Sequence, residues 1–85
     1  MCVLLSKTVH ILYFASLREK RGLSEESFQT AAATPLALYQ ELRAIHGFTL
    51  KSDVLKVAVN DEFQTWRVTL KSGDRIAFLP PMAGG

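Results

Sequence analysis

The sequence predicts an α+β domain in which a mixed sheet of four to five strands is covered by one main helix. Three observations support this fold class. Several short segments alternate apolar and other residues as strands do, one longer segment repeats apolar residues at helical spacing, and the segments follow the order strand, strand, helix, then two or three strands. Because a domain of 85 residues has room for one core, the helix is expected to pack across the sheet.

The first strand is expected from Thr8 to Ser16, where β-branched and aromatic residues alternate. Its two faces carry Val9, Ile11 and Tyr13 on one side and His10, Leu12 and Phe14 on the other. Both faces are fairly apolar, which fits a strand buried on both sides or a strand whose second face binds a partner. By alternation Leu12 could share a partner-binding face with Phe14, but burial in the core is the favoured interpretation.

A polar connection and a second strand are expected next. The segment Arg18–Gly22 is interpreted as a solvated turn region, because it lacks the glycine pattern of a phosphate-binding loop. Glu25–Thr30 is expected to form the second strand around Phe28. The two strands would then pair as a hairpin.

The main helix has local signals at both ends. Thr34 is expected to be its N-cap and Pro35 its first residue, where a missing N–H costs nothing. Gly47 is expected to end it. The apolar stripe that should face the core consists of Leu38, Tyr39, Leu42 and Ile45.

The remaining strands follow the helix. Val54–Val59 is expected to be a strand that turns at Asn60–Asp61, and a further alternating segment runs from Trp66 to Leu70. Arg75–Leu79 is expected to be the final strand. If the first and last strands lie side by side at the centre of the sheet, the arrangement is the ubiquitin-like β-grasp.

Composition excludes several functional classes. The chain is 48% hydrophobic and 21% charged, which is typical of a folded globular domain. Its ten Lys and Arg residues are scattered and its net charge is +2, so no nucleic-acid partner is expected. The one cysteine, Cys2, cannot form an internal disulfide. Met1–Leu5 is too short for a signal peptide core or a membrane span, so we expect a cytoplasmic protein without a membrane partner.

The end of the sequence predicts a tail. Pro80 and Pro81 remove two backbone donors and favour extended geometry, so the sheet should stop near Leu79. A domain over residues 1–79 and a flexible tail over 80–85 are therefore expected. Such a tail reaches at most about 20 Å, and the Gly84–Gly85 end, which has no Cβ atoms, can enter a narrow channel in another protein. Ordinary disorder of a chain end is the alternative interpretation.

No enzyme site, metal cluster or cofactor-binding motif is recognisable within the sequence, so we expect no bound cofactor and no metal. The carboxylate of Gly85 offers the only distinctive chemistry. ATP could activate this group as an acyl-adenylate, after which a sulfur nucleophile would leave a thiocarboxylate and an amine would give a protein conjugate.

Four segments together resemble the small subunits of molybdopterin synthases: Val9–Glu19, Thr34–Pro35, Val57–Asn60 and Ser72–Gly85. The resemblance covers nearly all of the chain, and its most specific part is the tail with two prolines, two spacers and Gly-Gly. It implies a β-grasp sulfur carrier that is not catalytic alone. An activating enzyme of the ubiquitin-activating type would use ATP to adenylate Gly85, which is then thiocarboxylated. The carrier would donate sulfur to cyclic pyranopterin monophosphate within a heterotetramer built on a dimer of large subunits.

The resemblance also implies which residues act. Gly85 carries the reacting carboxyl group and Gly84 keeps the tail slender. The apolar docking surface for the large subunit falls on Phe14, Phe63 and Leu79, and Leu79 replaces an aromatic residue that is frequent at this position. Arg18 matches a recurrent basic position, and either pairing with an acidic group on a partner or a solvent-exposed role would explain it. The tail residues expected to enter the partner's active site are Pro80, Pro81, Met82 and Ala83.

Two other functions remain open from the sequence. One is a related carrier for thiazole synthesis or transfer-RNA thiolation, or a ubiquitin-like modifier joined to lysines. The other is a β-grasp binding module without covalent chemistry.

Overall fold

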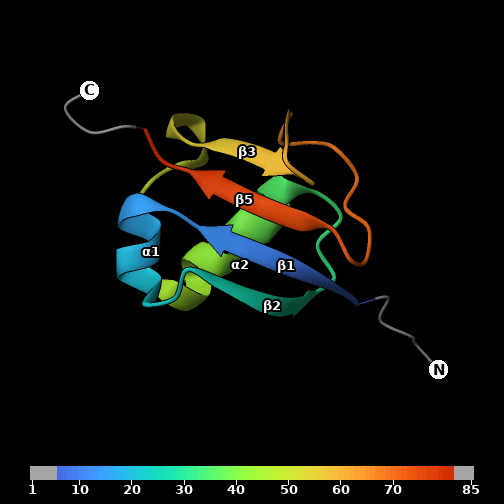
Figure 1. Cartoon of the computed structure of the whole chain (residues 1–85), viewed down its shortest axis with the longest axis horizontal. Coiled ribbons are helices and arrows are strands. Elements are labelled where there is room, and N and C mark those ends of the chain that lie inside the picture. Colours follow the sequence, from blue (N-terminus) through green and yellow to red (C-terminus); the bar gives the residue numbers. More distant parts are fainter. Residues whose placement is uncertain (1–5, 82–85) are drawn as a thin grey trace.

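A five-stranded mixed sheet organises residues 6–81, the part of the chain that the computed structural model describes (Figure 1). The strands are β1 (Lys7–Tyr13), β2 (Glu25–Thr30), β3 (Lys56–Val59), β4 (Glu62–Gln64) and β5 (Arg75–Leu79). The helices are α1 (Ala15–Arg21), α2 (Pro35–His46) and the short 3-10 helix η1 (Ser52–Val54).

The strand order confirms the predicted β-grasp. The order is β2-β1-β5-β3-β4, so the first and last strands lie side by side at the centre. β1 and β5 are parallel, whereas each of the other neighbouring pairs is antiparallel. The strands β1 and β2 do pair as expected, over the predicted second strand Glu25–Thr30.

The core lies between the sheet and α2, which crosses behind the strands in Figure 1. Alternation along the central strands turns Ile11 and Ile76, which are register partners, toward this helix, and both are fully buried. Tyr39 of α2 lies at the centre of an aromatic cluster, and Phe78 of β5 stacks on Trp66 with a centroid separation of 5.8 Å. The helix therefore covers one face of the sheet and leaves the other open.

The helix α2 begins and ends where its local signals predict. The Thr34 side chain accepts a hydrogen bond from the Ala37 backbone N–H, and Pro35 is the first helical residue. Gly47 ends the helix with a φ of 73°, a left-handed conformation that glycine adopts without steric cost. For one residue of the predicted apolar stripe of α2, the prediction that it faces the core is wrong. Ile45 is 56% exposed, because it lies at the edge of the buried face in the last turn, where Phe48 covers the core instead.

The predicted polar turn at Arg18–Gly22 and the predicted strand end at Ser16 are also wrong. The strand stops at Tyr13, and α1 fills the connection. Ala15 has a φ of 54°, which reverses the chain direction directly after Phe14, and the Leu17 side chain is buried beneath the helix. The hairpin partners β1 and β2 are therefore joined through a helix.

The predicted strand from Trp66 to Leu70 is absent from the described structure, which places a coil there. The alternation reflects packing, because Leu70 is buried and Trp66 and Val68 pack against the core. The backbone bonds instead to the segment that leads into α2: Trp66 O accepts from Leu36 N, and Leu70 N donates to Ala33 O. The strand expected from Val54 begins later, at Lys56, because η1 occupies Ser52–Val54.

Candidate functional site

The open face of the sheet carries a row of apolar residues that crosses the central strands. In the register of the sheet, Phe63 lies opposite Ala58, Ala58 opposite Ala77, and Ala77 opposite Leu12. Leu12, Ala58 and Ala77 each lie between buried neighbours that face α2, so these three residues face away from the helix. Phe63 is the register partner of Ala58 and therefore lies on the same face. The prediction that Leu12 is buried in the core is therefore wrong, since its side chain is half-buried on this open face.

Phe63 is the most prominent residue of the row. It is 71% exposed and lies in the short edge strand β4. The β3–β4 turn presents it, and Asn60 and Asp61 make this turn tight with φ values of 54° and 71°. Asn60 also joins the turn to the start of β5, because its side-chain oxygen accepts a hydrogen bond from the Arg75 backbone N–H at 3.0 Å.

A groove connects Phe63 to the point where the chain leaves the sheet. Its volume is about 290 Å³, and its lining residues are Val54, Lys56, Phe63, Leu79, Pro80 and Pro81. The lining is mainly apolar. Lys56 is the exception, and its Nζ lies 5.9 Å from the centroid of the Phe63 ring, a distance at which a cation and an aromatic face attract each other.

The parallel pairing of β1 and β5 brings Phe14 to the same end of the sheet as Leu79. Tyr13 and Phe78 are the last register partners of the two strands, and Phe14 and Leu79 follow them directly. Phe14 is the N-cap residue of α1 and is 43% exposed, while Leu79 is half-buried. Arg18 is exposed one turn further along α1.

We call the residues Leu12, Phe14, Ala58, Phe63, Ala77 and Leu79 the outer patch. Three of them, Phe14, Phe63 and Leu79, were expected from the sequence, and the fold brings them onto one side of the molecule. Ala58 and Ala77 were missed, and for Leu12 the sequence favoured burial in the core over a place on this face. Alternation along Arg75–Leu79 could have identified Ala77, but Ala58 is linked to the row only by the strand register.

Charged residues surround the outer patch. His10 lies 2.5 Å from Glu25, and Arg75 lies 3.2 Å from Asp61. Within residues 6–81, Arg18 and Lys56 have no such acidic partner. The patch is therefore flanked by two basic side chains that are available to a carboxylate on another molecule.

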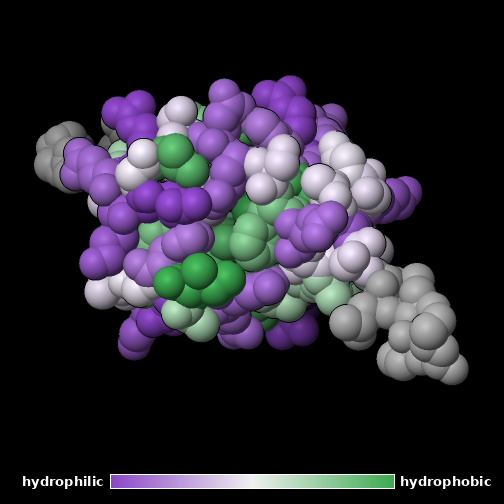
Figure 2. Space-filling model, turned by 90° about the horizontal axis from the view of Figure 1, so that it is seen from below, coloured by the Kyte–Doolittle hydropathy of each residue, from purple (hydrophilic) through white to green (hydrophobic). Residues whose placement is uncertain are grey.

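Figure 2 shows the molecule from below, from the side of β2, where hydrophobic areas lie among hydrophilic residues. Leu23 and Ile45 are exposed apolar residues elsewhere on the molecule, and neither belongs to a continuous apolar row in the sheet register. The outer patch is thus the extended apolar row of the described sheet.

The remaining predicted site residues lie partly within residues 6–81 and partly outside them. Pro80 is half-buried and Pro81 is exposed at the end of the groove. Met82, Ala83, Gly84 and Gly85 lie outside the described residues, as does Cys2. Among residues 6–81, no group of three or more His, Cys, Asp or Glu side chains is placed to hold a metal ion. No helix in that same range is long and apolar enough to span a lipid bilayer.

Comparisons with known proteins agree with this fold and with the predicted resemblance. A family model described as the ThiS family matches residues 11–85. The molybdopterin synthase sulfur carrier subunit of Haemophilus influenzae is 35% identical over 81 residues, which cover 91% of this chain and 99% of that protein.

Two solved structures are similar over almost their whole length. The putative molybdopterin converting factor subunit 1 from Pyrococcus furiosus has a TM-score of 0.73 at 27% identity, and the match covers 89% of this chain and 99% of that one. A protein–protein complex of subunits 1 and 2 of the molybdopterin-converting factor from Helicobacter pylori contains a chain with a TM-score of 0.62 at 29% identity, covering 92% of this chain and 99% of that chain. From the family match, the curated relative and the shared fold, this chain belongs to the ThiS family.

Proposed function

We propose that this chain is the sulfur carrier subunit of a molybdopterin synthase and that its outer patch binds the large subunit. One observation carries the proposal: Phe14, Phe63 and Leu79 lie on the same side of the sheet as Pro80 and Pro81, through which the chain leads toward Gly85. A partner that covers the patch would also receive the tail.

The chemistry is assigned to the carboxyl group of Gly85. Its oxygen attacks the α-phosphorus of ATP, and pyrophosphate leaves as the acyl-adenylate forms. A sulfur nucleophile then attacks the acyl carbon and displaces AMP, which leaves a thiocarboxylate. The carrier donates this sulfur to cyclic pyranopterin monophosphate, and water restores the carboxylate. Gly84 keeps the approach to this carbon free of side chains.

The carrier needs two protein partners in this scheme. An activating enzyme of the ubiquitin-activating type carries out the adenylation with ATP, and the large subunit binds the loaded carrier in a heterotetramer. The complex of subunits 1 and 2 from Helicobacter pylori supports the second partner, because one of its chains has this fold. We place these steps in the cytoplasm.

The outer patch has the residue types that supply binding free energy at protein interfaces. Apolar residues at the centre of an interface supply most of the binding free energy, and charged residues at its rim set orientation and association rate. Phe14 and Phe63 are the exposed aromatic residues of the patch. Arg18 and Lys56 flank it, so the facing surface of the large subunit is expected to carry carboxylates.

Intact-mass measurement tests the chemistry. The chain is incubated with its cognate activating enzyme, ATP and a sulfur donor, and the expected result is the mass gain of one oxygen-to-sulfur exchange. A variant that lacks Gly84 and Gly85 is the control, because it should fold and bind the large subunit yet gain no mass. An unchanged mass of the full chain would contradict the carrier function. Recovery of the chain joined to target lysines would instead favour a protein modifier.

A further inference from the structure

The helix α1 contains the proposed docking residue Arg18 and follows another, its N-cap residue Phe14, but the helix has little stability of its own. It contains seven residues, Phe14 provides no side-chain cap hydrogen bond, and its first turn has no acidic residue. Isolated helices shorter than about 12 residues are marginal in water even when their sequence favours a helix. The position of α1 therefore depends on contacts with the rest of the domain.

Two side chains of α1, Leu17 and Arg21, make the buried apolar contact and the charged contact that join this helix to the rest of the described fold. Leu17 is 2% exposed and packs in the core. At the other end of the helix, Arg21 donates to Glu26 through both arms of its guanidinium: Nε lies 3.0 Å from Oε2, and Nη2 lies 2.8 Å from Oε1. Such a two-point bond between charged groups fixes direction as well as distance.

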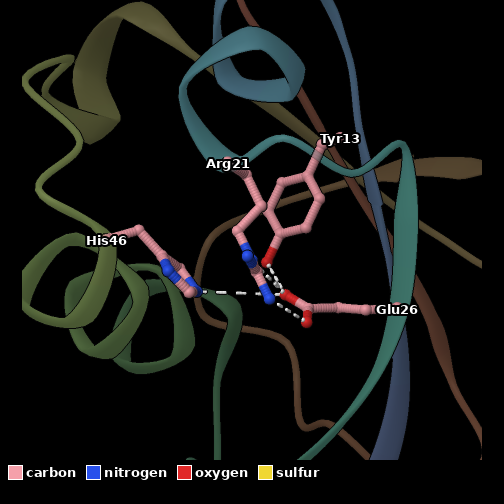
Figure 3. Close-up of polar contacts among 4 residues, drawn as sticks. All are labelled: Tyr13, Arg21, Glu26 and His46. Carbon is pink, nitrogen blue, oxygen red and sulfur yellow. Dashed lines mark hydrogen bonds and ion pairs between the residues drawn. The ribbon is translucent and has the colours of Figure 1, made fainter.

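Glu26 also binds the strand that precedes α1. The Tyr13 hydroxyl donates to Glu26 Oε2 at 2.6 Å, so one carboxylate joins the end of β1 to the end of α1 (Figure 3). Its carboxyl pKa lies below the ordinary value, mainly because Arg21 donates to the charged form. The side chain is 15% exposed, so little solvent competes for these bonds.

The helix α2 closes the third side of this cluster. His46 Nε2 lies 3.9 Å from Glu26 Oε2, and this buried nitrogen has no hydrogen-bond partner among the described residues (Figure 3). Glu26 thus lies between β1, α1 and α2, on the side of the sheet that faces α2, since its register partner is Ile11. It is on the opposite face from the outer patch.

We propose that Glu26 is a positioning residue that holds Phe14 and Arg18 in the arrangement needed for docking. Its two hydrogen-bond partners lie on either side of these residues in the sequence: Tyr13 directly precedes Phe14, and Arg21 follows Arg18 by three positions. Glu26 acts through α1 and not by touching the partner. Loss of its carboxylate would let α1 move. Binding of the large subunit would then have to order the helix, and the free energy that this costs would reduce the affinity. This inference rests on the proposed function for its effect on binding.

Hydrogen exchange and calorimetry on the full chain test the proposal together. Glu26→Gln removes the charge that Arg21 binds, and Arg21→Gln removes the other partner. Amides of α1 should exchange about tenfold faster in both variants, in line with the usual contribution of a hydrogen bond between charged groups. The dissociation constant for the large subunit should rise about threefold to tenfold, and the double variant should add little to either single change.

A matched control is available at the other end of β2. Glu41 of α2 accepts a hydrogen bond from the Thr30 hydroxyl at 2.6 Å, so Glu41→Gln also removes a partly buried carboxylate from a contact between α2 and β2. It does not touch α1 and should change neither α1 exchange nor affinity. Arg21→Lys, which keeps one charged bond, should recover part of both effects. Tryptophan fluorescence of Trp66 checks that each variant remains folded.

Three results would overturn the inference. One is unchanged α1 exchange in Glu26→Gln, and another is faster α1 exchange without any loss of affinity. The third is an equal effect of Glu41→Gln, which would mean that Glu26 acts only through overall stability. Failure of the wild-type chain to bind the large subunit would contradict the proposed function itself, and the exchange rates would still report on how Glu26 holds α1.

Discussion

Leu12 of β1 and Ala77 of β5 lie opposite each other at the centre of the open sheet face, although they come from the two ends of the chain. Their pairing is parallel, so both strands finish at the same end of the sheet. Because Phe14 directly follows β1 and Pro80 directly follows β5, Phe14 lies at the end of the sheet where the chain leaves β5. The outer patch therefore forms only when the first and last strands have paired.

Replacing Phe63 by alanine should weaken docking without damaging the fold. The side chain is 71% exposed, so its loss should change the free energy of unfolding by less than about 0.5 kcal/mol. As an aromatic contact in an apolar patch, it should contribute roughly 1 to 3 kcal/mol to binding of the large subunit. Isothermal titration calorimetry measures the affinity, and urea unfolding measures the stability.

The control for this change is Ile45→Ala, which removes another exposed apolar side chain far from the sheet register of the patch. Ile45 is 56% exposed on α2, so its loss should leave the affinity unchanged. An affinity that falls equally in both variants, or in neither, would remove Phe63 from the docking surface.

Phe78 should respond in the opposite way. It is fully buried, and its ring stacks on Trp66 and packs against Tyr39. Phe78→Ala should cost about 3 to 5 kcal/mol of unfolding free energy, because it leaves a cavity in addition to losing buried area. Trp66 is the only tryptophan, so its fluorescence reports this loss in a urea titration. A cost close to that of Phe63→Ala would mean that the core tolerates the cavity by collapse.

The sequence predicted those elements whose signals are local. Thr34, Pro35 and Gly47 set both ends of α2, and alternation around Phe28 located β2. The helix α1 was missed because Phe14 gives it no N-terminal capping signal, although Gly22 caps its C-terminal end in a left-handed conformation; Leu17 in the core and the Arg21–Glu26 bond join it to the rest of the domain. Such contacts join residues whose spatial proximity the sequence does not encode in any local pattern.

The sequence likewise predicted only part of the candidate site. Phe14, Phe63 and Leu79 followed from the resemblance to a known family, and the structure brings them to one side of the sheet. Ala58 and Lys56 depend on the β3–β5 register, in which they lie opposite Ala77 and Leu79. A one-residue shift would turn both toward the helix, so alternation alone could not assign them.

The cap of α2 gives a further test of the fold. Thr34 Oγ1 accepts from the Ala37 N–H at 3.2 Å, so Thr34→Ala should lower the free energy of unfolding by about 1 kcal/mol. Thr34→Ser keeps the hydroxyl and should retain most of the stability. Urea unfolding of the three proteins measures this difference. Equal losses in both variants would show that the methyl group of Thr34, and not its hydrogen bond, stabilises the helix start.

The Glu26 cluster should make the domain less stable in acid. Burial, aided by the nearby Arg21 charge, holds the pKa of His46 below its ordinary value of 6.5. The unfolded chain therefore binds a proton that the folded chain resists, and stability falls as the pH drops below 6.5 toward the folded pKa. The pKa of Glu26 lies below 4.5, so its stabilising contribution is complete above 4.5 and is lost as the pH falls through the folded value.

Two variants separate these contributions in urea titrations across this range. His46→Leu should flatten the decline of the unfolding free energy that begins near 6.5, because no proton is then resisted at this position. Glu26→Gln should flatten the part below 4.5 and should lower stability at neutral pH, where Arg21 loses its charged partner. Exposed His10 is the matched control, and His10→Gln should leave the slope assigned to His46 in place. A decline below 6.5 that persists in His46→Leu would assign the acid sensitivity to another group.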